Sequence, residues 1–289
     1  MKKFSLLTIT LIILTTPGFS QKVSGKLNFK KGQQIEIVTD TKSLVTQEAM
    51  GQTVEFKIDG SITHIYQVAD ANTKQATLGH KTKHIGLNMD GMGQTQSFDS
   101  DKKEDLDGQM GGPVKEILNK SYEMTIDQSG KVISVKEDTT QTKKQGDEAD
   151  MVGNILSKLG SALDAPVAGE ASFFKILPGK ELKKSDTWLD STEAPGGKEF
   201  IHYTLSDITP TEILLDYTST SNSDIKSDMM GMEATTHMVN NSKGKITIDR
   251  ASGILKNKTA ETESNGTVDI MGQSIPIKTK TSLTINVKS

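Results

Sequence analysis

The sequence contains no cysteine, a single arginine and few aromatic residues. The lack of cysteine excludes disulfide bonds, thiol catalysis and thiolate metal sites. With Arg250 as the only arginine, a nucleic-acid partner is not expected, because arginine supplies many of the phosphate and guanine contacts in such complexes. Aromatic residues make up 4% of the chain, which is too few for a thick core. This composition favours an antiparallel sheet with one covered face and one face in water.

Long apolar runs are also missing after the first 20 residues. Two lysines precede an apolar stretch from Phe4 to Leu14, and Pro17-Gly18 interrupts it before Ser20. This layout predicts a signal peptide over residues 1–20 and a mature protein that is periplasmic or secreted. The stretch is shorter than the roughly 20 apolar residues of a spanning helix, so no transmembrane anchor is expected. No cysteine follows it, which excludes a lipoprotein anchor.

Apolar and polar residues alternate over much of the chain, a pattern that predicts β-strands. Tyr122 to Val135 reads as a hairpin around the turn residues at 127–130, and a similar turn recurs at 249–253. From this recurrence we predict a mainly β fold of long twisted antiparallel sheets in two similar halves, each with one helix and half-barrel-like in shape. The halves are residues 21–136 and 148–289, joined by a polar linker at 137–147.

Other segments carry more local signals. Pro113 to Asn119 and Asp147 to Leu163 have apolar residues at helical spacing, which predicts two helices. Asp59-Gly60 separates two alternating runs and predicts a hairpin turn. Ala76 to Met89 is expected to be a long polar strand and a candidate edge strand.

The dipeptide Met-Gly occurs at residues 50–51, 92–93, 110–111, 230–231 and 271–272. Most copies lie between alternating runs, where glycine allows the positive φ of a hairpin tip. One interpretation is that each methionine packs on its own sheet as flexible filler. The other is that the methionine-bearing tips gather along one rim and bind a lipid, an apolar ligand or a partner protein. The candidate ligand-binding residues are the tip methionines and one face of the second predicted helix: Met50, Met92, Met230, Met271, Val152, Ile155 and Leu159.

A metal site is an alternative use of some of these methionines. Thioether and imidazole groups occur close together between residues 229 and 238, and soft thioether ligands select Cu(I). The other Met-Gly copies are scattered, which counts against this interpretation. The candidate copper ligands are Met229, Met230, Met232, His237 and Met238.

Patterns that specify an enzyme are absent from the sequence. No HExxH zinc-protease motif and no GxSxG nucleophile elbow occurs. His80 and His84 would lie about 13 Å apart along a strand, too far to share an ion. The acidic stretch from Asp99 to Gly108 contains two lysines that break the ligand pattern of an EF-hand, so a solvated loop is expected. We therefore predict no catalytic residues, no cofactor and no enzymatic activity.

The mature chain resembles a family of exported Bacteroidetes proteins of unknown function. The resemblance rests on residues 26–33, Phe98-Asp99-Ser100, the 122–135 hairpin, Ile176-Leu177-Pro178 and Asp186-Thr187-Trp188. It implies an envelope location and a long β-sheet, and it implies no catalytic residues. The sequence departs from the family at Ser185, where glycine commonly precedes the aspartate.

These observations favour a non-enzymatic envelope protein that binds a lipid or another apolar ligand on a concave sheet face. A cell-surface structural or interaction protein without a cavity, with an envelope protein as its partner, is the first alternative. A copper-binding protein is the second.

Overall fold

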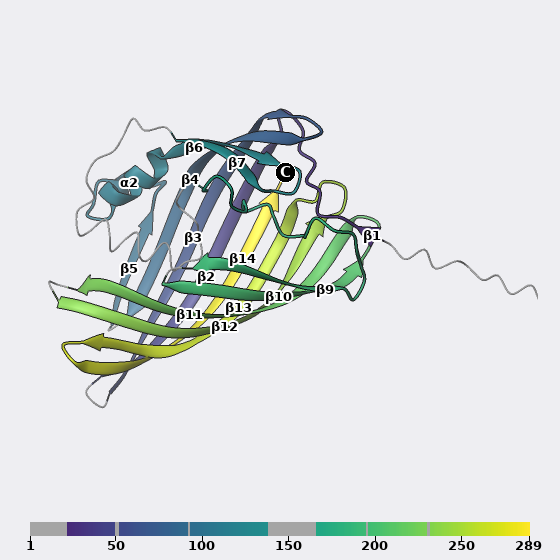
Figure 1. Cartoon of the computed structure of the whole chain (residues 1–289). Coiled ribbons are helices and arrows are strands. Elements are labelled where there is room, and N and C mark those ends of the chain that lie inside the picture. Colours follow the sequence, from purple (N-terminus) through teal and green to yellow (C-terminus); the bar gives the residue numbers. More distant parts are fainter. Residues whose placement is uncertain (1–21, 50–51, 92, 138–165, 195, 230–231) are drawn as a thin grey trace, which may run out of the picture.

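The structure is a computed structural model that describes residues 22–49, 52–91, 93–137, 166–194, 196–229 and 232–289. The described residues form long strands and two helices, so the predicted mainly β fold is confirmed. In chain order (Figure 1) the elements are β1 Lys22–Val23, β2 Gln34–Ala49, β3 Gln52–Ala71, β4 Gln75–Gly91, β5 Gln94–Asp99, α1 Lys103–Leu106, α2 Gly111–Asn119, β6 Ser121–Asp127, β7 Val132–Glu137, β8 Leu182–Lys183, β9 Thr187–Ala194, β10 Gly197–Ile208, β11 Glu212–Met229, β12 Met232–Asp249, β13 Leu255–Ile270 and β14 Gln273–Lys288.

Twelve strands form one antiparallel sheet in the order β7-β6-β4-β3-β2-β14-β13-β12-β11-β10-β9, with β5 paired to β4. The strands before and after residues 138–165 meet where β2 pairs with β14, for example at Ile37 and Val287. The long strands of both predicted halves therefore belong to a single continuous sheet, while the short strands β1 and β8 pair separately. The similarity of the two halves stays a prediction, and the helix predicted at 147–163 lies outside the described residues.

Several local predictions can be compared with the structure. The 122–135 hairpin and the helix at 113–119 are confirmed as β6–β7 and α2. The prediction of a turn at Asp59-Gly60 is wrong, because β3 continues through these residues and Gly60 pairs with Thr41 and Leu87. The edge position of β4 is also wrong, since β4 lies between β3 and β6 and buries Leu78 completely. The expected loop at 99–108 contains the short helix α1.

The sheet curls into a trough (Figure 1). Directly paired residues of antiparallel strands point to the same face. We call the part of the sheet around β3 and β4 one wing and the part around β10 and β11 the other. By this register, Ile35 and Tyr66 face the same side of the sheet as Leu205 and Leu215 of the other wing. All four residues share one buried cluster. Two wings can contact one cluster through the same face only if the sheet curls towards it. We call this concave side the inward face and the other the outward face.

One end of the trough is sealed by two largely irregular segments, residues 24–33 and 166–186, the second of which contains the short strand β8. The second segment is hydrogen-bonded to both wings: Val132 N donates to Glu170 O over 2.8 Å, and Ser185 N donates to Leu205 O over 2.8 Å. The rings of Phe29 and Phe174 meet edge to face, with centroids 5.3 Å apart, inside the buried cluster. Each fully buried side chain of this size stabilises the fold by about 2 kcal/mol.

The other end of the trough is where most Met-Gly dipeptides occur in the sequence. The strand ends that flank residues 50–51, 92–93, 230–231 and 271–272 all lie at this end, because β2, β4, β11 and β13 run towards it. We call it the open end. Among the described residues, neither helix has the length and apolar character needed to cross a membrane.

Candidate functional site

The inward face changes character along the strands between the sealed end and the open end. Beyond the sealed apolar cluster, a row of hydroxyl groups crosses five neighbouring strands. Two pairs in this row are hydrogen-bonded, Ser43 to Thr281 over 2.9 Å and Ser242 to Thr262 over 2.8 Å. Each hydroxyl has one donor and two acceptor sites, so these pairs keep capacity for a further partner. The row consists of Ser43, Thr281, Thr262, Ser242 and Ser219.

Apolar side chains follow between the hydroxyl row and the open end. The alternation of the strands places them on the inward face of both wings, where most are half-buried and Val268 is buried. We call this surface the apolar mouth. It consists of Val45, Phe56, Ile58, Met89, Ile225, Val268, Ile275 and Ile277. Ile58 and Met89 also pack against a second apolar cluster, formed by Ile62, Ile85, Leu87, Phe98 and Val114 of α2.

A lysine lies on the inward face at the boundary of the sealed cluster. Lys258 pairs with Ile246 and Ile285, and its ammonium lies 5.0 Å from the ring centroid of Tyr217. Burial lowers the pKa of Lys258, and the negative charge of Glu199 acts in the opposite direction. Among the described residues, no carboxylate lies within 4.0 Å of this ammonium.

Two histidines and two tyrosines form a polar cluster near the sealed end. His64 Nδ1 and His80 Nε2 share a hydrogen bond of 3.0 Å, and the Tyr66 and Tyr122 hydroxyls lie 3.1 Å apart. The His80 ring stacks on Tyr122 with centroids 4.4 Å apart, and His80 Nδ1 has no hydrogen-bond partner among the described residues. Burial lowers the pKa of His64 to about 4, and burial together with His64 lowers that of His80 to about 3.

The predicted ligand-binding residues are only partly described. Met271 occupies the β13–β14 turn with φ 52° and is 81% exposed, so it does not pack on its own sheet. This finding disfavours the filler interpretation at this one tip. The other predicted ligand-binding residues lie outside the described ones, and for them the prediction stays a prediction: Met50, Met92, Met230, Val152, Ile155 and Leu159.

The predicted copper ligands are not all brought together. His237 and Met238 are neighbours on β12 and therefore point to opposite faces. The His237 ring contacts Asp224 and Asp269 on the outward face, whereas Met238 lies beside Gly266. Met230 lies outside the described residues, and the side chains of Met229 and Met232 are likewise not described.

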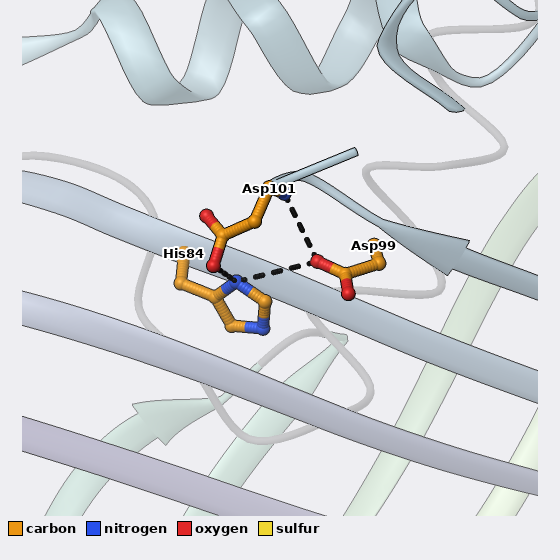
Figure 2. Close-up of side chains that lie close together, drawn as sticks. All are labelled: His84, Asp99 and Asp101. Carbon is orange, nitrogen blue, oxygen red and sulfur yellow. Dashed lines mark hydrogen bonds and ion pairs between the residues drawn. The ribbon is translucent and has the colours of Figure 1, made fainter. Parts of the chain in front are cut away.

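One cluster was missed by the sequence analysis. His84 on β4, Asp99 at the end of β5 and Asp101 in the following turn place three potential ligand atoms within 4.8 Å of one another (Figure 2). A Cβ added at Gly86 would lie 3.2 Å from His84 Nε2, so the ring lies over this glycine on the outward face. The available signal was the Asp-x-Asp spacing at a strand end, but only the β4–β5 pairing connects it to His84.

Comparison with known families identifies the chain. A model described as Family of unknown function (DUF6263) matches residues 73–255. Because the match spans more than half of the chain, the protein belongs to this family. No curated protein matches the chain.

Comparison with solved structures reveals a similar fold in lipovitellin, a protein described through its lipid–protein interactions. The identity is 12%, the TM-score is 0.50, and the match covers 91% of this chain and 26% of that chain. The present chain thus spans about a quarter of the lipovitellin chain. An outer membrane channel from Pseudomonas putida F1 gives 6% identity over 94% of this chain and 99% of that chain, but its TM-score of 0.22 is too low to indicate a shared fold.

Proposed function

We propose that this member of the DUF6263 family is a non-enzymatic binding protein for a lipid or a similar amphipathic molecule, held on the inward face of the trough. The proposal rests on the two adjacent parts of that face, the apolar mouth and the hydroxyl row. An apolar mouth at the open end accepts an acyl chain, and the hydroxyl row next to it offers donors and acceptors to a polar group. Binding sites for small molecules commonly combine a mostly apolar lining with a few convergent polar groups.

The fold similarity to lipovitellin supports this proposal. Both proteins share the fold, and lipovitellin is described through its interactions with lipid. The geometry of the sheet offers the same opportunity, because a strongly curled sheet presents an inward face that an apolar ligand can contact from several strands. At 12% identity, the argument rests on the shape and the residues of this chain and not on shared side chains.

The proposed location is the bacterial envelope, after cleavage of residues 1–20. The motivation is the charged start, the short apolar stretch and the small residue Ser20 before the cleavage position. Expression of the full chain with a periplasmic fraction assay tests this point. Recovery of the mature protein, shortened at Ser20, in that fraction is expected, whereas recovery of the uncleaved chain in the cytoplasm contradicts the location.

Binding can be tested with a fluorescent fatty acid and with lipid extracted from the purified protein. Ile277→Asp places a carboxylate in the apolar mouth, and we expect at least a tenfold loss of affinity, because an unpaired charge is costly to bury beside an acyl chain. Val239→Asp is the matched control, since Val239 is 50% exposed and lies on the outward face of β12. Equal affinities for the two variants, or no bound lipid in the wild-type protein, would contradict the proposal.

A protein partner at the edge of the sheet is a second candidate function. Leu189 on the outermost strand β9 is 78% exposed, and Phe200 on the neighbouring β10 is 57% exposed. Exposed apolar side chains beside a sheet edge suit the docking of another chain. Cross-linking in cells should capture an envelope protein with the wild-type chain but not with the Leu189→Glu variant. The same cross-linking pattern for both chains rejects this candidate.

A further inference from the structure

We propose that His84, Asp99 and Asp101 form a binding site for a divalent transition-metal ion on the outward face of the sheet. This site is separate from the inward face and does not depend on the proposed lipid binding. It also differs from the predicted copper site, because its ligands are one imidazole nitrogen and two carboxylate oxygens.

The carboxylates converge on a single ring nitrogen. His84 Nδ1 lies 3.7 Å from Asp99 Oδ1 and 3.3 Å from Asp101 Oδ2 (Figure 2). Both separations exceed the roughly 2.8 Å of a charge-assisted hydrogen bond, and the Ser100 hydroxyl lies 3.4 Å from the same nitrogen. The two N···O separations lie on either side of about 3.4 Å, which is the distance expected between two ligand atoms of a tetrahedral ion with bonds near 2.1 Å. The three ligand atoms all lie within 4.8 Å of one another, which is close enough for them to share one metal ion.

The other histidine with two aspartates has a different geometry. His237 Nδ1 lies 2.6 Å from Asp224 Oδ1, and His237 Nε2 lies 3.3 Å from Asp269 Oδ2. Each carboxylate thus uses its own ring nitrogen, which is the arrangement of an imidazolium between two ion pairs. The hydrogen bond to Asp224 raises the pKa of His237. At His237 the two carboxylates contact different ring nitrogens, whereas at His84 both carboxylates approach the same nitrogen.

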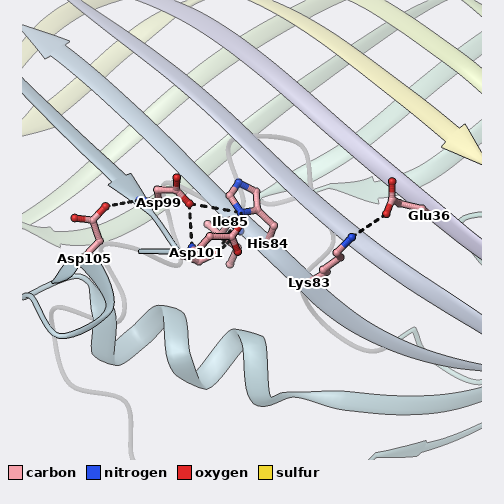
Figure 3. A network of polar contacts seen from close by, with 8 residues as sticks. Glu36, Lys83, His84, Ile85, Asp99, Asp101 and Asp105 are labelled. Carbon is pink, nitrogen blue, oxygen red and sulfur yellow. Dashed lines mark hydrogen bonds and ion pairs between the residues drawn. The ribbon is translucent and has the colours of Figure 1, made fainter. Parts of the chain in front are cut away.

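Hydrogen bonds hold the His84 site in place (Figure 3). Ser100 joins the turn to β4 in both directions, because Ile85 N donates to Ser100 Oγ and Ser100 N donates to Ile85 O, each over 2.9 Å. Asp101 N donates to Asp99 Oδ1 over 2.9 Å, and Asp99 N donates to Asp105 Oδ2 over 2.8 Å. The ligands are positioned by a strand and a braced turn, so little ordering is needed when an ion binds.

The negative charge of the site is not neutralised by neighbouring lysines. Among the described residues, no lysine or arginine nitrogen lies within 4.0 Å of the carboxylates of Asp99 and Asp101. Lys83, the residue next to His84, pairs with Glu36 over 3.2 Å instead (Figure 3). Two close carboxylates without a paired cation repel each other, and a bound divalent ion removes that repulsion.

The ligand types indicate the class of ion. Ca²⁺ takes six to eight oxygen ligands, so a site with an imidazole and two aspartates does not suit it. Imidazole with carboxylate suits Zn²⁺ and neighbouring transition metals. Asp101 is 76% exposed in its side chain, which leaves room for water to complete the coordination.

Calorimetric titration of the tag-free full chain with Zn²⁺, and separately with Ca²⁺, tests the site. We expect one Zn²⁺ per chain and no Ca²⁺ binding. Asp101→Asn and His84→Ala should each weaken Zn²⁺ binding at least tenfold. Asp101→Asn changes an exposed side chain conservatively, so circular dichroism should show an unchanged fold.

His237→Ala is the matched control, because it removes the other histidine with two aspartates. It should bind Zn²⁺ as tightly as the wild-type chain. The proposal is overturned if the wild-type chain takes up no Zn²⁺, if Asp101→Asn binds it unchanged, or if His237→Ala is the variant that loses it.

Discussion

Acidification should destabilise the protein through the buried pair His64 and His80. Burial lowers the pKa of these rings to about 4 and about 3, whereas an unfolded chain has the ordinary value. A lowered pKa in the folded state means that the folded protein favours the neutral ring. The stabilisation from this effect is complete above about pH 6.5 and is lost progressively as the pH falls towards the folded values.

The magnitude follows from linkage. At pH 5 the unfolded chain binds a proton at each histidine and the folded chain binds almost none, which costs about 2 kcal/mol per ring or about 4 kcal/mol for the pair. Most aspartate and glutamate side chains are still ionised at this pH, so they contribute little. His237 acts with the opposite sign, because its raised pKa stabilises the folded state at low pH and that contribution is lost as the pH rises through it.

Urea unfolding followed by the fluorescence of Trp188 measures the effect between pH 8 and pH 5. The His237→Gln background removes the opposing contribution. His80→Phe keeps a ring that stacks on Tyr122 and should halve the loss of unfolding free energy to about 2 kcal/mol. The reasoning is refuted if the unfolding free energy of the His237→Gln protein is the same at both pH values, or if His80→Phe leaves the pH dependence unchanged.

Four substitutions test the packing of the sealed end and its turns by thermal or urea unfolding. Ser185→Gly should raise the unfolding free energy by about 0.5–1 kcal/mol, because Ser185 has φ 72°, a backbone conformation that glycine adopts without strain. An unfolding free energy below that of the wild-type protein would contradict this reasoning. Gly253→Ala should cost more than Gly32→Ala, since both have positive φ but an added Cβ meets Lys26 O at 2.4 Å only at Gly253; equal costs reject the close packing. Phe174→Ala should cost about 3–5 kcal/mol, because this ring is fully buried in the sealed cluster; a cost below about 1 kcal/mol rejects its central place.

Much of the strand content could be predicted because the period of two reflects burial of one face. The 122–135 hairpin was predicted from local chemistry, and the structure explains why it works. Asp127 Oδ1 accepts hydrogen bonds from Ser129 N and Lys131 N, and Gly130 has φ 82°. Asp59-Gly60 carries a similar signal but lies inside β3, where tertiary pairing on both sides overrides the turn preference.

The curl of the sheet and the His84 site could not be predicted in the same way. The curl depends on which strands pair, and the pairing of β2 with β14 joins residues far apart in the sequence. The His84 site likewise needs the β4–β5 pairing and the bulge between Thr63 and His64 that shifts the register beside His84. The positive φ of Ser185 likewise could not be predicted, because it depends on how residues 183–186 join β10.

The two similar turns, at 127–130 and 249–253, have a shared role that the recurrence in the sequence did not suggest. Consecutive residues of the N-terminal segment bind one turn each: Leu27 N donates to Gln128 O, and Asn28 N donates to Ser252 O, both over 2.8 Å. Leu27 also belongs to the sealed cluster. The turns of β6–β7 and β12–β13 therefore each offer a carbonyl to the N-terminal segment at residues 24–33, although the two carbonyls occupy different positions in their turns. This segment joins the two wings across the sealed end, so the proposed ligand would have to enter from the open end, where the apolar mouth lies.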